Sequence, residues 1–538
     1  MPILPPNSSV KFFLYRKHAR YSIFLRPASN RKAFVLYLLF FIAFSSLHAV
    51  SVSSTSTGGA WNSGGTWVGG NVPAGTDDVI IASGATVTTG GNRSCNHLTI
   101  NGTLTVANGN ILTVTGDFTN NGTFNPGGTS ATVNFSGNNA LQTVSGNATA
   151  FNRIDVNKGS SYNNILNITC VITMASNGLD VFNGTFKLSS ASTITPFTGN
   201  PNLTSTAGFW NNGGNITCTN GNNFSFAGLF RHTAGTCNIG NSSNDFMRYA
   251  SGSTMIMEGG TVNIAGAFRP DAAATSTITY NQSGGTFVCG INGTNSSAVG
   301  VFDIGHTGSS FTMSGGSIVI VRSNANFSGG DYEVLAGTTS VTGGTIQIGN
   351  ASTPASQSIL INTTAPIYNL TVNSANSPTA TVMNNDITVK NTLTIMTGAT
   401  FDPANFDITV TGNWVNSGSY STGTSSVVLN GTGSHVINGT TTFYNLLVNT
   451  SGSVTLNSSI TVSNQLSFTR GILTGSSANM VIFADNAAVT GASDSGHVYG
   501  AVRKIGNDAF TFPVGNGTYY APIGISAPAN TNQEFTAQ

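Results

Sequence analysis

The chain has 538 residues, of which 65 are glycine and only 7% are charged, although 39% are hydrophobic. Charged residues make up about a quarter of an ordinary soluble protein, and a disordered chain combines high charge with low hydrophobicity. The composition therefore excludes intrinsic disorder, and 16 prolines without a Gly-X-Y period exclude collagen. The remaining Gly, Asn, Thr, Ser, Val and Ile are typical of β-strands and tight turns.

The first 49 residues are typical of an export signal. An unusually long basic segment precedes an apolar run over 33–44, and SSLHA then offers a small residue, Ala49, at the expected cleavage point. These are the parts of a secretory signal peptide, whereas a membrane span needs about 20 apolar residues. We therefore expect an exported protein, extracellular or at a bacterial cell surface, with no membrane span after removal of 1–49.

The charge of the remaining chain argues against nucleic acid as a partner. Seven of the 19 Lys and Arg residues lie in the first 32 positions, which leaves 12 basic against 18 acidic residues. Nucleic-acid-binding proteins carry a clustered basic surface, so we expect no nucleic-acid partner.

Seven related hexapeptides, from NGTFKL (183–188) to GGTIQI (343–348), start 21–31 residues apart. Their fourth and sixth positions are apolar in every copy, and the fifth is mostly polar. Period-two alternation places the apolar pair on one side of a strand, and the preceding glycines supply a turn or bulge. From these copies we predict structural core columns that contain Ile216, Cys218, Cys237, Ile239, Val262, Ile264, Phe287, Cys289, Ile318, Ile320, Ile346 and Ile348.

The repeats place one short strand in each coil of about 25 residues, with the same inward pair in every copy. This predicts stacked coils in which each inward residue packs on the equivalent residue of the next coil. We therefore predict an all-β fold, a right-handed parallel β-helix or solenoid, with almost no helix beyond the signal. Tandem β-sandwiches are the alternative, in which the strands would pair antiparallel.

A second kind of repeat flanks the hexapeptides on both sides. An apolar-x-apolar-Asn ending recurs in CNHLTIN (95–101), FNRIDVN (151–157), IYNLTVN (367–373) and FYNLLVN (443–449). Two longer pairs also match: LTVTGDFTNNGTF (112–124) with ITVTGNWVNSGSY (408–420), and ITVKNTLTI (387–395) with ITVSNQLSF (460–468).

These patterns divide the chain into six parts. The signal is followed by a capping β segment, three solenoid segments of which the middle one contains the glycine-rich hexapeptides, and the start of a C-terminal β-module that we expect to be truncated. Their bounds are 1–49, 50–94, 95–205, 206–350, 351–478 and 479–538.

The cysteines give no sign of a metal or redox centre. An odd number without a CxxC spacing does not support a zinc or redox motif. We interpret the cysteines of the inward columns as buried thiols that act as small apolar groups, and leave Cys218 with Cys237 open as a disulfide pair.

Side chains for catalysis are sparse. Many polysaccharide lyases and hydrolases are parallel β-helices, and such chemistry needs a general acid and base, usually carboxylates. Glu258 stands alone in its repeat position, and the histidines lack metal-ligand spacing. The nearest approaches to clusters, interpreted as turn or strand-end carboxylates, are Asp77–Asp78, Asp331-x-Glu333 and Asp402 with Asp407. We therefore expect no catalytic, cofactor-binding or metal site, no cofactor, and no enzyme.

Exposed aromatic side chains can stack on sugars, and the tryptophans are the candidates for such contacts in this sequence. Trp61 and Trp67 flank a glycine turn in AWNSGGTWVGGNVP, whereas Trp210 and Trp414 are isolated. The Trp61–Trp67 pair is interpreted as a cap on the open end of the solenoid, with stacking on a glycan as the alternative.

The segment GAWNSGGTWVGGNVPAGTDDVIIASGATVTT (59–89), with ITVTGNWVNSGSY, FYNLLVN and GHVYGAVRKIGNDAFTFPVGNGTYYAP (496–522), resembles repeat-rich secreted or cell-surface proteins of bacteroidete-type bacteria. The resemblance implies an adhesin-like, mostly uncharacterised protein of the outer membrane surface, in many members a cargo of type IX secretion, and it carries over no catalytic residue. The expected function is a non-enzymatic structural or adhesin-like solenoid whose partners are extracellular glycans or other surface proteins. A carbohydrate-active β-helix, either lyase, hydrolase or glycan-binding module, is the alternative.

Overall fold

The computed structural model describes residues 12–16, 19–23 and 50–538, apart from 219–222, 273–274, 296 and 325. The chain forms two units, Met1–Val50 and Ser51–Gln538. In the first, β1 (Phe12–Arg16) and β2 (Ala19–Ile23) pair antiparallel. The apolar run over 33–44 and the expected cleavage point at Ala49 lie outside the described residues. In the described part of the chain, no helix has the length and apolar character of a membrane span.

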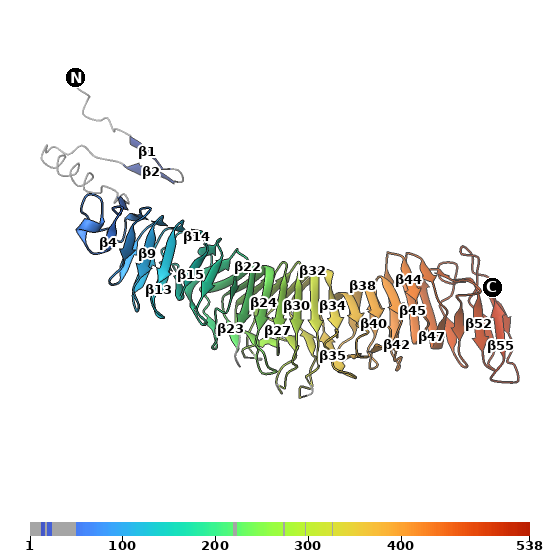
Figure 1. The fold of residues 1–538 in the computed structure, drawn as a ribbon. Coiled ribbons are helices and arrows are strands. Elements are labelled where there is room, and N and C mark those ends of the chain that lie inside the picture. Colours follow the sequence, from blue (N-terminus) through green and yellow to red (C-terminus); the bar gives the residue numbers. More distant parts are fainter. Residues whose placement is uncertain are drawn as a thin grey trace, which may run out of the picture. The chain divides into compact units, whose positions relative to one another are not determined.

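The second unit is a parallel β-solenoid (Figure 1) of about 19 turns, with successive coils following one another in chain order. Strand pairing between coils is parallel from β3 (Ser51–Ser53) on β5 (Asp78–Ile81) to β49 (Val481–Phe483) on β52 (Val502–Ile505). Among the described residues, the one helical element is a single 3-10 turn, Gly64–Thr66. The prediction of an all-β solenoid is confirmed, and the alternative of tandem β-sandwiches is wrong.

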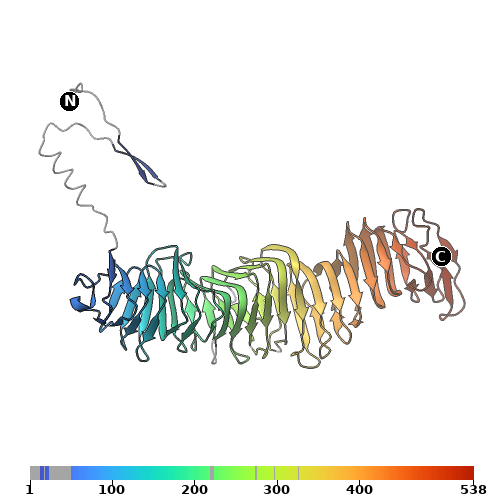
Figure 2. The same cartoon turned by 45° about the horizontal axis from the view of Figure 1, so that its top comes forward.

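Each full coil contributes an extended segment to each of three faces, and in some coils one long strand supplies two of them. A second view shows the resulting rows of parallel strands (Figure 2). In each row the strand of one coil pairs with that of the next. We name the faces by two early coils: face 1 holds β7 (Arg93–Cys95) and β10 (Ile111–Val114), face 2 holds β8 (Leu98–Ile100) and β11 (Phe118–Asn120), and face 3 holds β9 (Thr103–Val106) and β12 (Thr123–Pro126).

The predicted apolar columns form the inner side of face 3. Ile216 is in register with Cys237, and Cys237 with Val262; the column continues through Phe287 and Ile318 to the last copy. All twelve predicted column residues are buried, so this prediction is confirmed. They lie on β22 (Ala207–Cys218), β24 (Leu229–Ile239), β27 (Thr261–Ile264), β30 (Thr286–Cys289), β32 (Ser310–Ile320) and β34 (Thr338–Ile348).

One hexapeptide, NGTFKL (183–188), lies on a different face from the other six. It ends β19 (Leu179–Leu188), and its Phe186 is in register with Leu166 and with Phe209, all on face 2. The face 3 strand of that coil is β20 (Thr193–Ile194), whose Ile194 pairs with Ile216. Assigning NGTFKL to the same columns was therefore wrong, because its alternation fits any face with a buried inner side.

Glycines form the corner between faces 2 and 3 in these coils. Gly260 has φ +67°, and a Cβ on it would lie 2.5 Å from the carbonyl oxygen of Gly235 in the preceding coil. Gly316 has φ +74°, and a Cβ there would lie 2.5 Å from the carbonyl oxygen of Gly284. Left-handed backbone and close approach of successive coils both require glycine, which confirms the turn role assigned to these residues.

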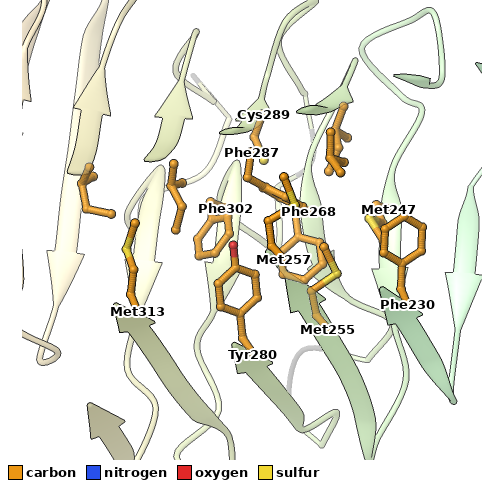
Figure 3. Close-up of a cluster of buried hydrophobic side chains, with 14 of the residues drawn as sticks. Phe230, Met247, Met255, Met257, Phe268, Tyr280, Phe287, Cys289, Phe302 and Met313 are labelled. Atoms are coloured by element: carbon orange, nitrogen blue, oxygen red, sulfur yellow. The ribbon is translucent and has the colours of Figure 1, made fainter. Parts of the chain in front are cut away.

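The interior of the central coils is filled by aromatic, Met and Cys side chains (Figure 3). The ring centroid of Phe268 lies 5.3 Å from each of Tyr249, Phe287 and Phe302. All five cysteines are buried and free, so the pair left open, Cys218 with Cys237, is not bonded. Burial raises the pKa of the Cys218 thiol to about 12, which keeps it a neutral apolar group.

The expected segments of the solenoid join without a break. Parallel pairing crosses 205/206 through β21 (Asn202–Leu203) and β23 (Phe224–Phe226), and it crosses 478/479 through β47 (Ile460–Arg470) and β49. Antiparallel strand pairs occur near the end of the unit, where β55 (Glu534–Ala537) joins β52 and where β53 (Phe510–Phe512) pairs with β54 (Ile523–Ile525). The boundary expected at 479 stays a prediction.

Candidate functional site

Trp61 and Trp67 belong to the segment between the first strands of the solenoid. The Trp67 Nε1–H donates to the carbonyl oxygen of Trp61 at 2.7 Å, and the two rings meet edge to face with centroids 5.1 Å apart. The side chains are 0% and 2% exposed. Stacking on a glycan would need an open ring face, so this placement argues against the glycan interpretation and favours the cap.

Three carboxylates gather on the outer side of face 1. Asp303 on β31 (Phe302–Ile304) is in register with Glu333 on β33 (Tyr332–Val334), and Asp331 directly precedes β33. Phe302 and Ile304 belong to the core, so Asp303 between them points outward. A Cβ built on Gly305 would lie 2.9 Å from Glu333 Oε1 and 3.1 Å from Asp303 Oδ1, so these oxygens approach a common point.

Segments between the strands cover these outward acids, leaving Asp303 4% and Asp331 2% exposed. The backbone N–H of Gly300 donates to Asp303 Oδ2 at 3.2 Å, and that of Gly305 donates to Oδ1 at 2.9 Å. Asp331 accepts the N–H groups of Asn324 at 2.6 Å and Leu360 at 2.8 Å. Asp303 therefore bonds the backbone on both sides of its own strand, and Asp331 joins the segment at Asn324 to β35 (Ser358–Thr363) of the next coil.

Burial is the main influence on both aspartates. It raises the pKa of Asp303 to about 7, helped by the charge of Glu333 and opposed by the N–H groups of Gly300 and Gly305. Burial also raises the pKa of Asp331 to about 7, opposed by the N–H groups of Leu360 and Asn324. A raised carboxyl pKa beside a second carboxylate is the electrostatic arrangement of a general acid, although a substrate would need the covering segments to open.

Two arginines continue the same outward column. Arg248 on β25 (Met247–Tyr249) is in register with Arg269 on β28 (Phe268–Pro270), and Phe268 is in register with Phe302. Both guanidinium groups lie over the Phe246 ring, 5.3 Å and 5.1 Å from its centroid. Burial, together with the charge of Arg248, lowers the pKa of Arg269, while Asp303 and Asp271 raise it. The column therefore passes from two cations to two acids.

A second polar group lies on the outer side of face 2, and we call it the Trp210 ladder: Lys187, Trp210, Arg231 and Glu258. Lys187, Trp210 and Arg231 are in register on successive coils. The Lys187 ammonium lies 3.7 Å and the Arg231 guanidinium 4.0 Å from the centroid of the indole ring. Arg231 also donates two hydrogen bonds to the Glu258 carboxylate, at 2.7 Å and 3.0 Å. Glu258, alone in its repeat position, thus has a partner from the preceding coil.

The sequence prediction missed both groups. The spacing Asp331-x-Glu333 is visible in the sequence, but Asp303 joins these residues from the preceding coil. Trp210 was interpreted as isolated, yet its partners lie one coil before and one coil after it. Assigning NGTFKL to face 2 would have predicted that Lys187 lies beside Trp210.

Two hollows on the surface lie elsewhere. One is lined by residues that include Ser130, Arg153 and Gly178, and the other by residues that include Asp180, Phe182 and Pro201. No residue of the carboxylate group or of the Trp210 ladder lines either hollow. Within the described ranges, no set of three or more His, Cys, Asp or Glu side chains is arranged to hold a metal ion.

Comparisons of the chain with protein-family models, with curated proteins and with solved structures found no match.

Proposed function

We propose that the chain is a non-enzymatic structural or adhesin-like solenoid, exported to a bacterial cell surface or the extracellular space. The observation that carries this proposal is the unbroken parallel ladder from β3 to β52, whose polar side chains bond mainly coil to coil. Asn263 donates to Asn238 at 2.8 Å and Asn464 to Asn445 at 2.7 Å, for example. Such a stack offers long regular faces, which suit display and multivalent contact.

The location rests on the sequence. The basic and apolar segments within 1–49 are those of a secretory signal. The repeats resemble those of surface proteins of bacteroidete-type bacteria, many of them cargo of type IX secretion, and on this resemblance the proposal includes that route and partners among extracellular glycans or surface proteins.

Surface location is tested by protease treatment of intact cells that produce the protein. We expect the protein to be degraded while a cytoplasmic marker stays intact, and we expect deletion of residues 1–49 to retain it inside the cell. Protection from the protease in intact cells, together with degradation after lysis, would contradict export.

A second candidate function, a carbohydrate-active β-helix, is favoured by the approach of Asp303 to Glu333 and by the raised pKa of Asp303. A panel of acidic and neutral polysaccharides, assayed for reducing ends and for unsaturated uronates, separates the two candidates. We expect no turnover. Turnover that Asp303→Asn and Glu333→Gln abolish would establish the enzyme instead.

A further inference from the structure

The Trp210 ladder carries an unbalanced positive charge on its surface. Arg231 is neutralised by Glu258, and their side chains are 30% and 35% exposed. Among the described residues, no carboxylate pairs with Lys187. The ladder therefore has net charge +1, on a unit that has more acidic than basic residues.

The indole of Trp210 holds these two cations in place. Cations at 3.7 Å and 4.0 Å from the ring centroid are within the range of cation–π attraction. The Trp210 Nε1–H donates to Thr233 Oγ1 at 2.9 Å, which fixes the ring. Burial and the nearby charge of Arg231 lower the pKa of Lys187. An anion beside Lys187 would offset this repulsion.

A row of hydroxyl and amide groups runs beside the ladder, along the corner between faces 2 and 3. Asn212 Nδ2 donates to Ser189 Oγ at 3.2 Å, and Thr233 Oγ1 donates to Asn212 Oδ1 at 2.5 Å. Parallel coils repeat at about 4.8 Å, so Lys187 and Arg231, which are two coils apart, are separated by about 9.6 Å along the stack, with hydroxyl groups beside them. A linear polymer that carries both carboxylates and hydroxyl groups is complementary to this surface, whereas a run of acidic residues supplies carboxylates without the hydroxyl groups.

We propose that the Trp210 ladder on face 2 binds the carboxylates of an acidic polysaccharide. Lys187 contacts a carboxylate and Trp210 positions its ammonium group, while Arg231, whose Nε and Nη2 groups bond to Glu258, packs on the same indole ring. The Ser189–Asn212–Thr233 row faces the sugar hydroxyls. The inference rests on the proposed function, because an exported protein meets such polymers outside the cell.

The experiment measures binding of oligogalacturonate to the purified exported chain by titration calorimetry. We expect Lys187→Gln to weaken binding about tenfold, as loss of a charge-assisted contact does. Arg231→Gln should weaken binding as well, because it leaves the Glu258 carboxylate uncompensated beside the site. The matched control is Arg503→Gln, which removes the arginine of another exposed pair, Arg503–Glu534 at 3.1 Å, and should leave binding unchanged. We also expect the methyl ester of the oligosaccharide not to bind, and salt to weaken binding by the acid form.

Three results would overturn the inference: equal binding of the methyl ester, equal binding of polyglutamate, or binding that Lys187→Gln and Arg231→Gln leave unchanged. Circular dichroism and thermal melts confirm that each variant is folded, and Lys187→Arg, which retains the charge, should restore binding. A chain that reaches the cell surface without binding would defeat this inference alone. A chain that binds the oligosaccharide but stays inside the cell would defeat the proposed function.

Discussion

The central coils, residues 229–363, and the later coils, residues 387–470, share one interior but differ in coil length. Partners on adjacent later coils, such as Asn445 and Asn464, are 19 residues apart. In the central coils, Asp331 bonds to Leu360 across 29 residues, and Ser323 bonds to Gln357 across 34. The central coils contain ten Asp, Glu, Lys and Arg residues in 135 positions, and the later coils contain four in 84, so the longer coils are slightly richer in charge.

The additional residues of the central coils lie outside the strands and cover them. Asp303 is buried in this way, and so are Val288 and Val319 on the outer side of face 3, which pack with Val321. In the later coils, outward residues such as Asn445 remain partly exposed. Burial of an outward side chain therefore depends on coil length, whereas burial of an inward side chain depends on strand alternation.

The largest expected effect concerns the shared interior. Phe268 and Phe443 are both fully buried, and Phe443 lies 5.2 Å from Trp414 between ring centroids. Replacement of a buried Phe by Ala costs about 3–5 kcal/mol, so Phe268→Ala and Phe443→Ala should destabilise their own regions alike. Hydrogen exchange of the adjacent strands measures the local loss, since long repeat arrays do not unfold in two states.

The control is Phe182→Ala, because this side chain is 49% exposed and its loss should change stability by less than about 0.5 kcal/mol. A large loss in the central coils with none at Phe443 would mean that the interiors of the two regions differ.

The next effect tests the glycine corner of the central coils. Gly260 and Gly252 both have positive φ, but a Cβ on Gly252 would meet nothing within 4 Å. Gly252→Ala should therefore cost only the left-handed strain, about 1–2 kcal/mol. Gly260→Ala adds a backbone clash and should cost about 3 kcal/mol in total. Equal losses of exchange protection would show that successive coils do not need their close approach at this corner.

Strand alternation predicted what is buried but not which face a strand occupies. FYNLLVN places Phe443 on face 1 and Leu446 on face 2, whereas IYNLTVN places Leu370 on face 3. The three faces impose nearly the same requirement, an apolar inner side followed by a corner, so the same motif fits any pair of them. Glycine also occurs at the corner between faces 2 and 3 outside the central coils, as Gly412 does between β40 (Ile408–Val410) and β41 (Asn413–Asn416).

The carboxylate group was beyond prediction for another reason. Asp303 accepts N–H groups from Gly300 and Gly305 on either side of its own strand, and Asp331 accepts the N–H of Leu360 from the next coil. The sequences FDI (302–304) and DYEV (331–334) contain no local pattern that would predict the burial of these acids. The Trp210 ladder was also missed, but it needed only the correct coil offset.

A smaller effect, the dependence of local stability on pH, should distinguish the central coils from the later coils. Because burial raises the pKa of Asp303 and Asp331 from 3.8 to about 7, the folded state holds protons that the unfolded state releases. Their contribution to stability is therefore present at low pH and is lost as the pH rises towards and through about 7. Between about pH 5 and about pH 8, exchange in 298–305 and 322–333, corrected for its intrinsic pH dependence, should rise by about tenfold, a change of about 1.4 kcal/mol.

Asp303→Asn combined with Asp331→Asn keeps the neutral state at every pH and should flatten this dependence. The matched variant Asp402→Asn with Asp407→Asn, in the later coils, should leave it in place. The same pH dependence in the double Asp303 and Asp331 variant would assign the effect to other groups.

The smallest effect tests why the exposed columns of the short coils are polar but uncharged. Asn464 donates to Asn445 at 2.7 Å, and Asn445→Ala should cost about 1 kcal/mol, the net value of one hydrogen bond. Changing both residues to Asp should cost more at low salt, because like charges on adjacent strands repel. Both side chains are partly exposed, so salt should recover part of the loss, whereas at Asp303 burial raises the pKa of the carboxyl instead. A double variant whose melting temperature does not respond to salt would show that coil stacking does not limit charge in this chain.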